Sequence, residues 1–97
     1  MQIYNWNSEK NEQLIAERGV SFEEIIFFIE NDGLLDEIAH PNSADYGHQR
    51  IFVVAVDRYV HLVPYVKNDD EIFLKTIIPS RKFTKIYFGE EVWVASN

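Results

Sequence analysis

The sequence predicts an α+β domain in which two N-terminal helices pack on an antiparallel β meander, followed by a short C-terminal helix. Residues 8–31 hold two segments with helical start and stop signals, and residues 49–78 hold three runs rich in β-branched and aromatic residues. Helices followed by a run of strands are typical of α+β domains. Because there is no repeat, linker or low-complexity tract, we expect residues 1–97 to form one domain.

The N-terminal helices are predicted from their caps. A short strand at residues 2–6 is expected to lead into a first helix over residues 8–18, which the following glycine ends. Ser21 and Glu24 match the capping-box pattern, and apolar residues then recur at helical spacing. This pattern predicts a second helix over residues 22–31.

The meander is predicted from strand-like runs separated by turn residues. A short strand is expected at residues 34–38, followed by strands at residues 49–56, 59–66 and 71–78. Pro64 falls inside the second of these three runs and has no N–H to donate. That strand is therefore expected to lie at a sheet edge or to carry a bulge at the proline.

The stretch 73–87 carries the strongest functional signal. Pro79 should end the last strand, and Ser80 should cap a third helix that stops before Gly89. Two cations fall in the first helical turn, where the helix dipole disfavours positive charge unless an anion docks there. The whole net charge of −7 lies in residues 1–50, whereas residues 72–89 hold four basic residues and no acidic one.

Composition excludes several kinds of site. There is no cysteine, and the three histidines, His40, His48 and His61, have no partner at zinc-ligand spacing, so we expect no metal and no cofactor. No apolar run approaches the roughly 20 residues of a membrane span. The N-terminal residues lack the features of a signal peptide. We therefore expect a cytoplasmic protein with no membrane partner.

The basic stretch and nearby aromatic residues suggest chemistry on RNA. Lys75 alternates with Phe73 and Ile77 on its strand and should share a face with them, and in an antiparallel pairing either His61 or Tyr65 on the preceding strand can approach it. A base to activate the 2′-hydroxyl, cations for the charged transition state and aromatic rings for the bases are the groups that a metal-independent ribonuclease needs. The alternative is that Lys75 and Arg81 pair with the acidic half of the chain.

Three blocks of the chain match a known family pattern. They are YNWN at residues 4–7 with Lys10 and Asn11, RGVSFEE at residues 18–24, and IIPSRKFT at residues 77–84 with Tyr87. In these blocks the chain resembles the BrnT-like toxins of bacterial type II toxin–antitoxin pairs. The resemblance implies a RelE-like fold and an endoribonuclease, neutralised by a cognate antitoxin that is usually a ribbon-helix-helix protein.

Two functional hypotheses follow. The first is a toxin that cleaves mRNA without a metal, with RNA as substrate and the antitoxin as partner. Its candidate catalytic residues are Lys75, Arg81, His61 and Tyr87, and its candidate RNA-binding residues are Lys82, Lys85 and Tyr65. The second is a catalytically degenerate toxin-like domain that acts as a protein-binding module, motivated by the acidic net charge and by the apolar residues 92–94.

Overall fold

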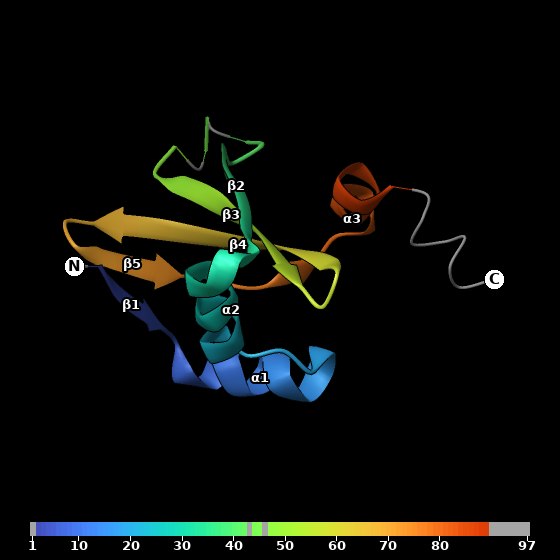
Figure 1. Cartoon of the computed structure of the whole chain (residues 1–97). Helices are drawn as coiled ribbons and strands as arrows, with labels where there is room; N and C mark the ends of the chain where they lie inside the picture. Colours follow the sequence, from blue (N-terminus) through green and yellow to red (C-terminus); the bar gives the residue numbers. More distant parts are fainter. Residues whose placement is uncertain (1, 43, 46, 90–97) are drawn as a thin grey trace.

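Three α-helices and a mixed β-sheet make up the part of the chain that the computed structural model describes, residues 2–42, 44–45 and 47–89 (Figure 1). The elements in chain order are β1 (Ile3–Trp6), α1 (Ser8–Arg18), α2 (Phe22–Phe28), the π-turn η1 (Ile29–Gly33), β2 (Leu34–Ala39), β3 (Gln49–Val56), β4 (Tyr59–Asn68), β5 (Glu71–Leu74), β6 (Ile78–Pro79) and α3 (Arg81–Phe88). The predicted α+β class is confirmed.

Side-chain caps set the starts of the first two helices. The Asn7 side chain accepts a hydrogen bond from the backbone N–H of Lys10 at 2.9 Å, and α1 ends at Gly19 with a left-handed φ of 68°. Both hydrogen bonds of the Ser21–Glu24 capping box are present at the start of α2. The bounds predicted for α1 and the predicted start of α2 are confirmed.

The end of α2 differs from the prediction. The helix was expected to continue to Asn31, but it ends at Phe28 and passes into η1, where Asn31 and Asp32 leave helical geometry. At Gly33 the backbone comes so close that a Cβ would lie 2.6 Å from the carbonyl oxygen of Phe28 and 3.0 Å from that of Ala55. The chain turns sharply into β2 there because a glycine leaves room for this approach.

The sheet has the strand order β1-β5-β4-β3-β2, with β6 also paired to β4. Neighbouring strands from β2 to β5 are antiparallel, as predicted, but β1 pairs with β5 in parallel. The predicted antiparallel meander is confirmed, and the parallel pairing of β1 makes the whole sheet mixed. After β1 the chain crosses through α1 and α2 before it enters the meander, so β1 can join the far edge in the same direction as β5.

Pro64 interrupts the pairing along one side of β4. Tyr65 pairs with Leu74 of β5, and Leu62 pairs with Ile78 of β6, so three steps along β4 match four steps along the other segment. The extra residue is a bulge, and it lies opposite the proline, which has no N–H to offer to a ladder. The bulge was predicted in the strand that holds Pro64, but the extra residue lies in the neighbouring segment, and the single strand predicted over residues 71–78 is split into β5 and β6.

The two faces of the sheet have different neighbours. We call the face that carries Phe52 and Val63 the helix face, because these residues join the core cluster with Phe22 of α2. The opposite face carries Val53 and Leu62, and we call it the α3 face. Figure 1 shows α1 and α2 on one side of the sheet and α3 apart from them.

Asn11 joins the two helices that cover the helix face. Its side chain is only 7% exposed, its oxygen accepts a hydrogen bond from the backbone N–H of Phe22 at 2.8 Å, and its amide nitrogen donates to the Glu23 carboxylate at 2.8 Å. A buried side chain of α1 therefore completes the start of α2.

We expect Asn11→Ala to lower the free energy of unfolding by about 1–3 kcal/mol, because it leaves the buried N–H of Phe22 without an acceptor. Urea unfolding measures this loss. The control is Gln13→Ala on the exposed side of the same helix, which should change stability by less than about 0.5 kcal/mol. Equal losses in both variants would contradict the role of Asn11.

Candidate functional site

The first turn of α3 is fixed to the start of β4 by a closed set of hydrogen bonds. The hydroxyl of Ser80 caps the helix by accepting from the N–H of Phe83 at 3.1 Å, and the N–H of Ser80 donates to the carbonyl of Val60 at 2.9 Å. The N–H of Val60 donates to the hydroxyl of Thr84 at 2.9 Å, and this hydroxyl donates to the carbonyl of Ser80 at 2.7 Å. Thr84 is 1% exposed, so buried hydrogen bonds anchor the first turn of α3 to β4.

The outer side of α3 is basic. Its exposed cations are Arg81, Lys82 and Lys85. There is no acidic residue in the first turn to balance them. The guanidinium carbon of Arg58 lies 5.1 Å from the centre of the Phe88 ring, so the β3–β4 turn adds one more cation at the C-terminal end of α3. The sequence did not point to Arg58 as a site residue, because nothing local links it to α3.

Lys75 extends this basic surface along the sheet. Phe73 pairs with Val66 and therefore lies on the α3 face. The ammonium of Lys75 lies 5.6 Å from the centre of the Phe73 ring, so Lys75 is on the same face. The predicted sharing of a face with Phe73 is confirmed. The expectation that Ile77 also shares it is wrong, since the bulge turns Ile77 into the core of the helix face.

The register shows that neither of the two candidate residues of β4 lies beside Lys75. His61 and Tyr65 alternate with residues of the α3 face, so both belong to the helix face and neither shares a face with Lys75. Tyr65 is 3% exposed, and its ring is stacked on Phe52 with the ring centres 4.0 Å apart. It therefore offers no ring face to an RNA strand that lies along α3.

His61 is half-buried on the helix face, and its Nδ1 lies 3.1 Å from the carbonyl oxygen of Tyr59. The pKa of His61 is lowered, first because burial disfavours the imidazolium and then because of the charge of Arg18. The Tyr59 carbonyl and the carboxylates of Glu24 and Asp57 oppose this shift. The neutral imidazole that results can accept a proton near pH 7.

Arg18 connects the helix layer to the start of α3. Its guanidinium donates to the carbonyl oxygen of Ile77. Pro79, two residues further on, is the pairing partner of His61, and Arg81 follows two residues after that. The structure thus brings His61 and Arg18 to the strand that leads into α3. Sequence reasoning did not select Arg18 as a site residue, although it begins the RGVSFEE block.

Tyr87 lies further along α3, and its hydroxyl donates to the Asp36 carboxylate of β2 at 3.5 Å. The pKa of Tyr87 is raised, first by partial burial and then by the charge of Asp36. Tyr87 therefore stays protonated at neutral pH, which suits a proton donor better than a base.

Comparison with known proteins found no match among protein-family models, curated proteins or solved structures.

Within residues 2–42, 44–45 and 47–89, no three His, Asp or Glu side chains gather so that they can hold a metal ion. In the same part of the chain, no helix has the length and apolar character needed to cross a membrane. Residues 92–94, a candidate partner-binding tail, lie outside the described residues.

We expect Thr84→Val to lower the free energy of unfolding by about 1–3 kcal/mol, because the isosteric side chain leaves the buried N–H of Val60 unpaired. Urea unfolding is again the measurement. Thr76→Val is the control, since its hydroxyl makes no hydrogen bond to the described residues. If both variants are as stable as the wild type, the hydrogen bonds do not hold α3 in place.

The lowered pKa of His61 predicts a pH-dependent stability. Unfolding restores its pKa to about 6.5, so protonation favours the unfolded chain. The stability that the neutral ring contributes is present above pH 6.5 and is lost as the pH falls through the folded pKa. His61→Gln should therefore lose less stability than the wild type between pH 7.5 and pH 5, measured by urea unfolding at both pH values. The exposed His48, changed to Gln, should leave the wild-type loss intact.

Proposed function

We propose that this protein is the toxin of a type II toxin–antitoxin pair. In this proposal it is a metal-independent endoribonuclease that acts in the cytoplasm, cleaves mRNA and is neutralised by a cognate antitoxin of the ribbon-helix-helix type. The observation that carries the proposal is the basic surface of α3 and Lys75 on a chain with a net charge of −7. The resemblance to the BrnT-like toxins and the order of helices and strands support a RelE-like fold.

The basic surface suits the phosphate chemistry of the proposed reaction. Arg81, Lys82 and Lys75 would hold the scissile phosphate and stabilise the charge that develops on it, while Lys85 would bind the neighbouring backbone. His61 is neutral at pH 7 and would remove the proton of the 2′-hydroxyl. Tyr87 keeps its proton and would donate it to the leaving oxygen. In this reaction the 2′-oxygen of the RNA attacks the adjacent phosphorus and the 5′-oxygen leaves with the proton of Tyr87. The step needs no metal ion and no cofactor.

A second candidate function is a catalytically degenerate toxin-like domain that binds a partner protein. Two observations favour it. His61 and Lys75 lie on opposite faces of the sheet, so the proposed base is separated from one of the proposed cations. Exposed apolar side chains also flank the cations, with Ile78 42% exposed and Ile86 61% exposed.

Arg81→Ala separates the two functions. Expression of the wild-type chain alone should arrest growth, and the purified protein should cleave single-stranded RNA in the presence of a metal chelator. We expect Arg81→Ala to lower the cleavage rate by about 100-fold or more, as when one donor to a developing anion is removed, and to restore growth. Arg50→Ala is the matched control, because it removes an exposed arginine from the helix face.

The outcome that favours the binding module is equally clear. Normal growth with the wild-type chain, no RNA cleavage and capture of a small basic ribbon-helix-helix protein would reject the nuclease and retain the partner. Either conclusion requires that Arg81→Ala and Arg50→Ala have the same melting temperature as the wild type, because this shows that both variants fold.

A further inference from the structure

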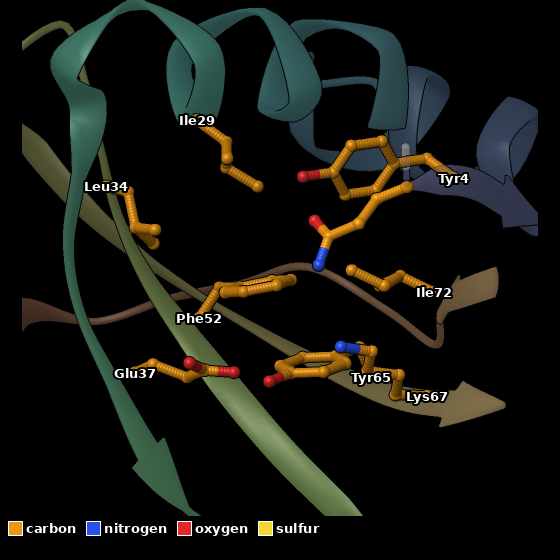
Figure 2. A pocket seen from close by; sticks show the side chains of 9 residues that line it. Tyr4, Ile29, Leu34, Glu37, Phe52, Tyr65, Lys67 and Ile72 are labelled. Carbon is orange, nitrogen blue, oxygen red and sulfur yellow. The ribbon is translucent and has the colours of Figure 1, made fainter. Parts of the chain in front are cut away.

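A hollow of about 280 Å³ opens on the helix face, where Phe52, Tyr65 and Ile72 form part of its lining. Its lining comes from the residue before β1, from η1 and from the strands β1 to β5, and consists of Gln2, Tyr4, Ile29, Leu34, Glu37, Phe52, Tyr65, Lys67 and Ile72. Figure 2 shows Tyr4 and Ile29 on one side of the hollow and the rings of Phe52 and Tyr65 on the other. The basic residues of α3 and Lys75 are not part of it, so this is a separate site.

The hollow holds a buried polar group without a partner. Tyr65 is 3% exposed, yet its hydroxyl makes no hydrogen bond to any of the described residues. Figure 2 shows this hydroxyl on the side of the ring toward Glu37. Buried hydroxyl groups in proteins are nearly always paired, and an unpaired one is unfavourable. A ligand in the hollow would supply the missing partner.

The other polar groups at the hollow define what fits. The hydroxyl of Tyr4 and the ammonium of Lys67 also make no hydrogen bond or ion pair to the described residues. Burial and the charge of Glu30 raise the pKa of Tyr4, so its hydroxyl keeps its proton. The lining thus combines aromatic rings with hydrogen-bond donors and one carboxylate, that of Glu37. Its volume is just below the range of about 300–1,000 Å³ for small-molecule sites, so the hollow has room for one ring system.

A nucleobase has the features that this lining fits, a flat ring with hydrogen-bond donors and acceptors along its edge. Guanine is the base that presents two adjacent N–H donors, at N1 and N2, to a single carboxylate, with a carbonyl oxygen beside them for a lysine. The Nε of Arg50 lies 3.6 Å from one carboxylate oxygen of Glu37, and among the described residues no cation pairs with the other oxygen. We propose that the hollow between Tyr4 and the Phe52–Tyr65 pair binds a nucleobase, with Glu37 selecting guanine.

The base can belong to a free mononucleotide or to an RNA strand. This inference does not rest on the proposed function, because base binding is measured without cleavage and on the opposite face from α3. The probes are guanosine 5′-monophosphate, inosine 5′-monophosphate, which lacks only the 2-amino group, and a five-nucleotide RNA with one central guanine. The RNA is added to the Arg81→Ala chain so that no cleavage intervenes.

The measurement is a titration of the full chain followed by amide NMR shifts, up to about 10 mM nucleotide, where a site of millimolar affinity is mostly filled. We expect guanosine monophosphate to shift the amides of Tyr4, Phe52 and Ile72 and to bind more tightly than inosine monophosphate. Glu37→Gln should weaken guanosine monophosphate about 10-fold or more and abolish this preference. Glu37→Gln should still bind inosine monophosphate.

Tyr65→Phe tests the unpaired hydroxyl. We expect it to weaken guanosine monophosphate about 2- to 12-fold, the effect of one hydrogen bond. It should not lower the melting temperature, because the hydroxyl has no partner in the described residues. Tyr59→Phe, on the same strand and face but outside the hollow, is the matched control and should bind like the wild type.

Each outcome decides the proposal. Tighter binding of the RNA than of the mononucleotide, weakened by adding Tyr65→Phe, identifies an RNA base as the occupant, and the reverse order identifies a free mononucleotide. No shift of these amides with any probe overturns the site. Equal affinity of Tyr65→Phe and Tyr59→Phe, or equal affinity for the two mononucleotides, overturns the assigned contacts.

Discussion

The missing N–H of Pro64 is the constraint on which the arrangement of the two faces depends. Because this residue cannot donate to a ladder, the segment beside β4 bulges, and the pairing resumes one residue out of step. The bulge leaves Lys75 beside Phe73 on the α3 face and turns Ile77 into the core. It also sets the register of Pro79, and with it the point where α3 begins.

The start of α3 inherits this register. Once Pro79 pairs with His61, the N–H of Ser80 reaches the carbonyl of Val60, and the buried hydroxyl of Thr84 closes the set of hydrogen bonds. The cations of the first helical turn therefore lie on a helix that is anchored to β4, although the helix dipole disfavours positive charge there. This cost is reasonable at a surface that binds an anion, and it supports the proposal of a phosphate-binding site.

The candidate site was only partly predictable from the sequence. The cations of residues 75–85 were found because they are close in the chain and stand out against an acidic background. The sequence did not predict on which face of the sheet His61 lies relative to Lys75, because a shift of one residue in register moves a side chain to the other face. Tyr65 is buried against Phe52 for the same reason. Arg18 and Arg58 were missed because their contacts, with Ile77 and Phe88, join distant parts of the chain.

The sequence by itself determined the helix starts, the α+β class and the charge distribution, because caps, turn residues and apolar periodicity act over a few residues. It also predicted that Pro64 would disturb the pairing of a strand. Only the tertiary structure decided that β1 runs parallel to β5, that the disturbance splits one strand into two, and which face each side chain of β4 occupies. Pairing between distant strands sets these features, and no local preference specifies it.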